Sequence, residues 1–257
     1  MAEALRQGAA IEISGLSKGF GRTRVLADLA LDISMGEVLT VLGPNGSGKT
    51  TLIKILATLT RPDKGSIRVV GLDLAKQGHQ ARRYIGVVTH EPMLYADLTG
   101  YENLKLCGRM FHLDRLEDRI AEVAERMAIT PRVHHRVGTL SNGLRKRLSI
   151  ARALLHDPPV LLMDEPFGAL DALTRAHLQD SLMEIHAQLG TTVIMITHDV
   201  DEAVLLSDRI VMMNNGPAAT IGEILDIALP RPRDRLALAD NKQYNHYRHE
   251  VLTFLYD

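Results

Sequence analysis

A short glycine-rich run near the start of the chain has the pattern of a loop that binds phosphate. The run is Gly43-Pro44-Asn45-Gly46-Ser47-Gly48-Lys49-Thr50, with Thr51 directly after it. Glycines allow successive backbone N–H groups to turn toward an anion, and a helix that begins at the loop adds the positive end of its dipole. Lys49 is predicted to reach the β- and γ-phosphates of a nucleotide, and the Thr50 hydroxyl to ligate Mg²⁺. Many classes of protein share this loop, so it predicts nucleotide binding without naming the protein.

Two adjacent acids follow an apolar run in the second half of the chain. Asp164 and Glu165 come directly after Val160–Met163. Burying neighbouring carboxylates without a cation is costly, so the end of a strand beside a phosphate site is a natural position for Mg²⁺. We expect Asp164 to hold the metal, through water, and Glu165 to orient or deprotonate the water that attacks the γ-phosphate. A solvated Asp-Glu pair is the alternative, and the phosphate loop upstream favours the functional interpretation.

One histidine is distinguished by its position. His198 comes soon after the apolar run Thr192–Ile196, and ligands of open α/β sheets gather at the carboxyl ends of the strands. We therefore expect His198 at the same edge as Lys49 and Asp164, as a catalytic residue. Four other histidines have no such support and are expected on the surface: His134, His135, His246 and His249.

The elements that must position these residues alternate between strands and helices. Apolar runs predict buried strands at Glu37–Leu42, Ser66–Val70, Ile85–Val88, Val160–Met163, Thr192–Ile196 and Arg209–Met213, after β-rich segments at Ile11–Ser14 and Ala27–Ile33. A helix is predicted over Lys49–Leu59, and the chain turns helical between about Thr89 and Pro158. This order predicts an α/β fold with a parallel sheet covered on both sides. Together with the phosphate loop, it resembles the RecA-like core of P-loop NTPases.

A single domain is expected over residues 1–257. Residues 1–88 and 159–222 are assigned to the nucleotide-binding core with an antiparallel β subdomain, 89–158 to a helical subdomain and 223–257 to a polar tail. The net charge of −1 gives no sign of a nucleic-acid partner, and the single cysteine, Cys107, suits a reducing compartment. Neither a signal peptide nor an apolar stretch of about 18 residues is visible, so a membrane connection is expected to come through a partner.

The run Leu140-Ser141-Asn142-Gly143-Leu144-Arg145-Lys146-Arg147 resembles the signature motif of ABC ATPases. The phosphate loop before it, and Asp164-Glu165, Asp171 and His198 after it, follow the order and spacing of that family. The resemblance covers nearly the whole chain and implies a head-to-tail dimer that binds ATP and Mg²⁺ in two composite sites. Ser141 and the Gly143 amide of one subunit then close over the γ-phosphate that Lys49 of the other subunit holds. A motif that opens a helix suits this role, because the dipole favours an anion; alone, it would be an ordinary cap.

The resemblance implies further roles. Phe20 matches the aromatic residue that stacks on adenine, with a core phenylalanine as the alternative. Asp171 matches the loop that links the two active sites. The segment His90–Asn103 matches the region that touches the membrane subunit, with Leu94, Tyr95 and Leu98 as the expected contacts.

Three positions depart from the family pattern. His90 stands where the family usually has a glutamine that offers an oxygen to Mg²⁺, Leu144 replaces another glutamine and Asn142 replaces a glycine. Mg²⁺ prefers oxygen ligands, so His90 is expected to reach the metal through water. Because Lys49, Glu165 and Ser141 are all present, we expect ATP hydrolysis.

Two parts of the chain resemble different transporters. From about Ile11 to Asp164 it looks like the ATPases of exporters, including the haem-exporter type; from about Pro166 onward it looks like importers of the nitrate, sulfonate and taurine group. The change falls near Asp164–Gly168, which leaves open a recombined sequence. The more distinctive tail favours import of a small oxyanion such as nitrate or sulfonate. The implied partners are transmembrane permease subunits at the cytoplasmic face of the membrane, a second ABC ATPase (identical or paired) and, for an importer, a substrate-binding protein.

Other classes of function remain as alternatives. An exporter ATPase fits the first part of the chain. A non-transport ABC ATPase typically carries long coiled-coil insertions or two fused cassettes, which are not seen here. A metabolic kinase or GTPase with the same loop leaves the signature motif unexplained. A binding or regulatory module fits only if His90 and Leu144 disable turnover.

Overall fold

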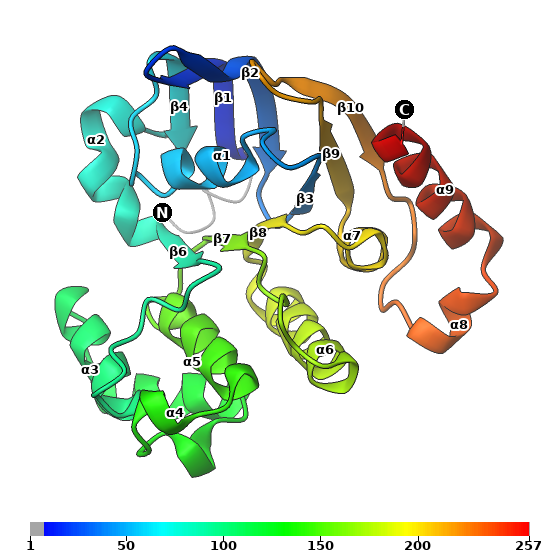
Figure 1. The fold of residues 1–257 in the computed structure, drawn as a ribbon. Helices are drawn as coiled ribbons and strands as arrows, with labels where there is room; N and C mark the ends of the chain where they lie inside the picture. The colour runs from blue at the N-terminus through cyan, green and yellow to red at the C-terminus, as the bar shows by residue number, and fades with distance from the viewer. Residues whose placement is uncertain (1–7, 257) are drawn as a thin grey trace.

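The computed structural model describes residues 8–256, which form two sheets and the helices around them (Figure 1). The larger sheet has the strand order β10-β9-β3-β8-β7-β6. Its members are β3 (Val38–Leu42), β6 (Ile85–Val88), β7 (Val160–Asp164), β8 (Thr192–Ile196), β9 (Arg209–Met213) and β10 (Ile221–Asp226). All pairings are parallel except that of β10 with β9. Every residue of β3, β7 and β8 is buried, which explains why these strands are continuous apolar runs rather than alternating ones.

The smaller sheet is antiparallel, with the order β2-β1-β4-β5. It is built from β1 (Ala9–Phe20), β2 (Thr23–Ser34), β4 (Lys64–Val69) and β5 (Leu72–Asp73). Ile11 lies opposite Ile33 on one side and Val69 on the other. The apolar face of this sheet shares a core with Leu52 and Ile55 of α1 (Lys49–Leu56) and with strands of the larger sheet. The parallel core with an antiparallel β layer therefore has the predicted α/β class.

The first helix is shorter than predicted. The expected apolar face extended to Leu59, but α1 ends at Leu56 and Leu59 is 57% exposed. The chain reverses after Ala57, because Thr58 takes a left-handed conformation with φ of 61° and the Leu59 N–H donates to the Lys54 carbonyl. The prediction of a helix through Leu59 was therefore wrong by one turn.

A separate group of helices lies on the far side of the larger sheet from the smaller one (Figure 1). It comprises α3 (Gly100–Met110), α4 (Leu116–Arg126) and α5 (Asn142–Leu154), with 3₁₀ turns at Thr130–Arg132 and Val137–Thr139. Thr99 and Glu102 form a capping box at the start of α3. The remaining helices are α2 (Leu74–Ala81, continued by a 3₁₀ turn at Arg82–Tyr84), α6 (Ala172–Leu189), α7 (Val200–Leu206), α8 (Arg235–Ala239) and α9 (Lys242–Tyr256).

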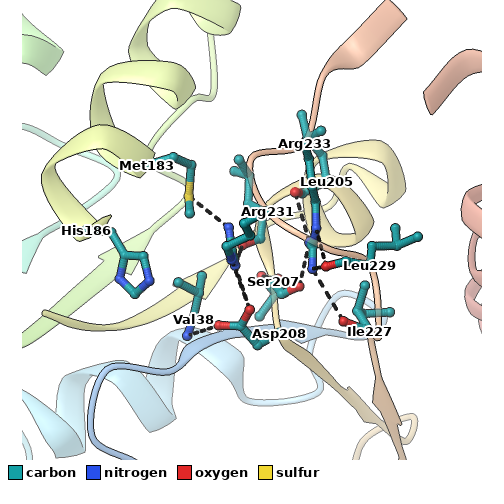
Figure 2. A network of polar contacts seen from close by, with 12 residues as sticks. Val38, Met183, His186, Leu205, Ser207, Asp208, Ile227, Leu229, Arg231 and Arg233 are labelled. Carbon is teal, nitrogen blue, oxygen red and sulfur yellow. Dashed lines mark hydrogen bonds and ion pairs between the residues drawn. The ribbon is translucent and has the colours of Figure 1, made fainter. Parts of the chain in front are cut away.

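The tail is fixed to α7 by two arginines (Figure 2). Arg231 donates to the Asp208 carboxylate and to the Leu206 carbonyl. The guanidinium of Arg233 donates to five backbone carbonyls, those of Val204, Leu205, Ser207, Ile227 and Leu229. Burial lowers the pKa of Arg233 to about 10, so the group stays charged at neutral pH. Because Val204, Leu205 and Ser207 include the last carbonyls of α7, Arg233 caps that helix.

No helix of residues 8–256 is both long enough and apolar enough to cross a membrane.

Candidate functional site

The phosphate loop leaves β3 at Leu42 and enters α1 at Lys49. Two of its glycines are required by close packing as well as by their backbone conformations. At Gly48, with φ of 88°, a Cβ atom would lie 2.6 Å from the Leu26 side chain. At Gly43, with φ of 149°, it would lie 2.9 Å from the Met213 carbonyl oxygen. The loop is therefore pressed against β2 and β9, which explains how its backbone is held for binding an anion.

Lys49 is almost completely buried, at 6% exposure, at the start of α1. Its ammonium donates to the carbonyls of Gly43 and Pro44, at 2.7 and 2.8 Å. Burial lowers the pKa of Lys49, and the nearby carboxylates of Glu165 and Asp164 act in the opposite direction. The lysine thus lies over the phosphate loop and beside the two acids, where a polyphosphate would meet both the cation and the loop N–H groups.

Thr50 and Asp164 come together although they are 114 residues apart. The Thr50 hydroxyl donates to an Asp164 carboxylate oxygen at 3.4 Å. Burial raises the pKa of Asp164, while the Thr50 hydrogen bond lowers it. Within residues 8–256 no three His, Cys, Asp or Glu side chains cluster as a protein-only metal site. A hydroxyl beside one carboxylate fits Mg²⁺, which takes one or two protein oxygens and completes its shell with water and phosphate.

Glu165 lies between two imidazole rings. One carboxylate oxygen is 2.9 Å from His198 Nε2, and the other is 3.3 Å from His90 Nδ1. The backbone of Glu165 is left-handed, with φ of 48°, and its N–H donates to the Ile196 carbonyl. This turn directs the carboxylate toward the ends of β6 and β8, where the two histidines lie. The structure thus places His198 beside Glu165, at the edge of the sheet where His198 was expected. It also places His90 against Glu165, whereas the sequence analysis predicted only that His90 acts near the metal.

A further residue of this region was missed by the sequence analysis. Lys146 of α5 is 6% exposed, and its ammonium donates to the carbonyls of Thr89, His90 and Glu165. Burial lowers its pKa, and Asp164 and Glu165 oppose that change. Backbone carbonyls are common to all residues, so nothing in the residue types could have indicated this contact.

The predicted signature residues lie elsewhere in the same chain. Ser141 and Gly143 are at the N-terminus of α5, among the helices, whereas the phosphate loop lies between β3 and α1 (Figure 1). The Ser141 hydroxyl accepts a hydrogen bond from the Leu144 N–H at 3.3 Å and so caps the helix. Asp171 caps the neighbouring helix α6 by accepting from the Thr174 N–H, and this hydrogen bond is the main reason that the pKa of Asp171 is low.

Phe20 lies at the end of β1 with 54% of its surface exposed, and the Lys18 ammonium is 5.2 Å from the centre of its ring. This excludes the alternative of a core phenylalanine and leaves the ring free to stack on a ligand. The four histidines expected on the surface are all exposed.

The expected permease-contact segment borders an apolar groove of about 430 Å³ beside α3. Tyr95 is 63% exposed and lines it, as do Leu94 and the side chains of Met93, Leu106, Cys107 and Met110. Leu98, also expected as a contact, is partly buried and is not among the lining residues.

Comparisons with known proteins agree with this geometry. The model of the ABC transporter family matches residues 26–168. The nitrate transport protein NasD of Klebsiella oxytoca is 44% identical over 256 residues, covering 96% of each chain. The bicarbonate transport ATP-binding protein CmpD of Synechococcus elongatus is 39% identical over 241 residues, covering 92% of this chain and 85% of its own.

Among solved structures, a dimer of the ATP-binding cassette MJ0796 bound to ADP and Pi superposes with a TM-score of 0.77 at 26% identity, covering 86% of this chain and all of that one. These relatives agree with three features of the structure: the phosphate loop, the two acids at the end of β7 and the helix that Ser141 caps. The chain belongs to the ABC transporter family and is one of its ATP-hydrolysing cassettes.

Proposed function

We propose that the protein powers the import of a small oxyanion, such as nitrate, by hydrolysing ATP beneath a membrane permease. The observation that carries the proposal is the similarity to NasD, whose name gives nitrate as its cargo, along 96% of both chains. CmpD, named for bicarbonate, is similar over 92% of this chain. Both alignments include the part before Asp164 and the part after it. The first part of the chain resembles haem-exporter ATPases, so export is the second candidate function, and a transport experiment must test it.

The hydrolytic roles follow from the site. The phosphate loop, Lys49 and Thr51 bind the phosphates of ATP. Thr50 and Asp164 hold Mg²⁺, which when bound neutralises charge on the phosphates. Glu165 accepts the proton of the attacking water, and His198 keeps the Glu165 carboxylate turned toward the loop. His90 contributes to the metal through water, and Phe20 stacks on adenine.

The site is completed by a second subunit. Ser141 and Gly143 lie at an exposed helix start, apart from the phosphate loop of their own chain, and a helix N-terminus attracts anions. In a head-to-tail dimer they would serve the ATP held by the partner, with Asp171 between the two sites. The dimeric state of the similar cassette MJ0796 supports this arrangement.

The permease would contact the groove beside α3. Its exposed apolar side chains, Met93, Tyr95 and Met110 among them, offer a surface that a helix of a membrane subunit can cover. The protein would then lie at the cytoplasmic face of the membrane, with a substrate-binding protein on the other side.

ATP turnover of the purified protein beside Glu165→Gln tests the enzymatic core of the proposal. Wild type is expected to hydrolyse ATP, while Glu165→Gln binds ATP, loses turnover by at least about 100-fold because the proton acceptor is gone, and accumulates as a dimer. Equal activity in the two proteins contradicts the role of Glu165. A mutant that stays monomeric with ATP contradicts the composite site.

The direction of transport needs a separate experiment. Cells that express the chain with a nitrate-type permease and its substrate-binding protein should take up nitrate, and the same cells with Glu165→Gln should not. If the chain co-purifies with an exporter-type permease and not with the nitrate-type one, the import proposal is contradicted and export is favoured.

A further inference from the structure

Lys146 is a buried cation that the proposed hydrolysis leaves without a role. Its ammonium has three protons to donate and lies within 3.2–3.3 Å of three carbonyl oxygens, those of Thr89, His90 and Glu165. Burying an ammonium is costly unless its hydrogen bonds are satisfied. The charges of Asp164 and Glu165 add to the compensation. A cation that is buried and satisfied in this way holds the three carbonyls in one arrangement.

The three carbonyls belong to two different turns of the backbone. Thr89 and His90 follow β6, and Glu165 follows β7. The side chains of His90 and Glu165 also meet, at 3.3 Å. Lys146 therefore fixes the main chains of two residues whose side chains touch, and one of these is the proposed proton acceptor in an unfavourable left-handed conformation.

Lys146 also connects these turns to the signature motif. It lies in α5 one helical turn after Asn142, the residue that follows the Ser141 cap. Any shift of the motif along or about the helix axis moves the Lys146 side chain with it, because a helix turn is rigid.

We propose that Lys146 is a positioning residue for ATP hydrolysis, which sets the backbone of Glu165 and His90 and makes their position depend on the N-terminus of α5. The inference rests on the proposed function. When the dimer closes on Ser141 and Gly143, a movement of the α5 N-terminus would shift Lys146, and Lys146 would shift the backbone of Glu165 in the same subunit. Lys146 touches no substrate in this role and acts only through the two residues that it holds.

Steady-state ATP hydrolysis by the full-length Lys146→Met protein tests the proposal. Methionine keeps an unbranched apolar side chain and removes the three hydrogen bonds. A small displacement of a catalytic group is enough to lower kcat by about 10- to 100-fold. KM for ATP should change less than about threefold, because Lys49 and the phosphate loop are untouched. Lys146→Arg keeps the charge and can reach at least two of the carbonyls, so it should recover part of kcat.

Two controls separate positioning from mere support of the fold. Lys105→Met removes another lysine of the helical region, one that binds Glu117 on the surface, and should leave kcat and KM unchanged. Lys146→Arg is the second control, because it keeps the charge and some of the hydrogen bonds and should therefore recover part of the kcat that Lys146→Met loses.

The outcomes are distinct. Wild-type kcat in Lys146→Met overturns the inference, and so does a Lys146→Arg protein whose kcat is no higher than that of Lys146→Met. The inference is also overturned if Lys146→Met lowers the melting temperature but leaves kcat per folded molecule unchanged. Lys146 would then only stabilise the fold. In each of these cases the proposed function stands if wild type hydrolyses ATP and Glu165→Gln does not. Failure of that comparison would remove the proposed function and the inference together.

Discussion

Both oxygens of the Glu165 carboxylate face imidazole rings, and this is the main difference between the site and the family pattern. The usual glutamine has an amide at the position of His90, whereas here a ring nitrogen lies 3.3 Å from Glu165. His198 holds the other oxygen at 2.9 Å. A carboxylate with both oxygens engaged has few orientations available, so the site gains rigidity at Glu165, the residue that we propose as the proton acceptor.

A different histidine links stability to pH. His156 stacks on Phe111, with ring centres 3.9 Å apart, and its Nε2 lies 3.2 Å from the Ile85 carbonyl. Burial lowers the pKa of His156 to about 4. A histidine with a folded pKa below its unfolded value of about 6.5 stabilises the fold at pH values above 6.5 and loses this contribution as the pH falls toward 4.

We therefore expect the free energy of unfolding to fall by up to about 3 kcal/mol between pH 7 and pH 4 through His156 alone. Urea unfolding at pH 7.0, 5.5 and 4.5 measures the change. His156→Gln keeps a donor for the Ile85 carbonyl and does not titrate, so its stability should depend less on pH over this interval. A variant with the same pH dependence as wild type would assign the acid sensitivity to other groups.

At the scale of elements, the attachment of the tail to α7 depends on Arg233. The residue caps α7 through three carbonyls and binds two more in the tail itself (Figure 2). At the other end of α7, Asp201 accepts from the Tyr244 hydroxyl of α9 at 3.1 Å and pairs with Arg248. Helix α7 begins at Val200, after its N-cap Asp199, so the tail is attached to the element that follows the turn containing His198.

Arg233→Met is expected to destabilise the protein by about 3 kcal/mol, because five carbonyls lose a charged donor in a partly buried place. Arg235→Met removes an ion pair with the exposed Asp180 and one hydrogen bond, to the Ala176 carbonyl, and should cost less than about 1 kcal/mol. Urea unfolding midpoints of both variants and of wild type measure the difference. Equal midpoints for the two variants would show that the tail contributes little to the stability of the rest.

Five of the six strands of the larger sheet could be predicted from the sequence with little error, but the edge strand β10, none of whose residues is buried, was missed. β3, β7 and β8 are buried on both faces, so each appears as a run of apolar residues, and the polar residues after them mark the edge that carries the site. The end of α1 could not be predicted, because Leu59 has apolar character and helical spacing but lies beyond a left-handed residue.

The contacts between the residues of the site were harder to predict from the sequence than the strands. Lys49, Asp164, Glu165 and His198 could be placed at one edge by topology alone. The contact of His90 with Glu165 depends on the left-handed backbone of Glu165, with φ of 48°. Glutamate is not a residue type that predicts this conformation. The roles of Lys146 and Arg233 depend on backbone carbonyls, whose positions follow from the completed fold and not from any residue type.

At the scale of the whole molecule, the composite site that we propose predicts that two inactive variants can rescue each other. In that arrangement Lys49→Ala would remove the phosphate contact, and Gly143→Asp would put a negative charge at the helix start that faces the partner's nucleotide. Each homodimer is expected to be inactive. In a mixed dimer one of the two sites joins an intact Lys49 to an intact Gly143, so an equal mixture should recover up to about a quarter of wild-type activity.

ATPase assays of the separate variants and of mixtures at several ratios measure this rescue. Wild type mixed with Lys49→Ala serves as the reference for subunit exchange. If the mixture of the two variants stays inactive while subunits exchange, each chain would need both residues for itself, and the head-to-tail arrangement would be wrong.

The carbonyl contacts of Arg233 also bear on how the attachment of the tail to α7 depends on ionic strength. Exposed pairs such as Arg115 with Asp118 weaken as dissolved ions accumulate, since the screening length falls from about 10 Å at 0.1 M salt to about 3 Å at 1 M. Partly buried hydrogen bonds from a guanidinium to backbone dipoles are screened much less. The tail should therefore remain docked on α7 in concentrated salt that weakens the exposed ion pairs.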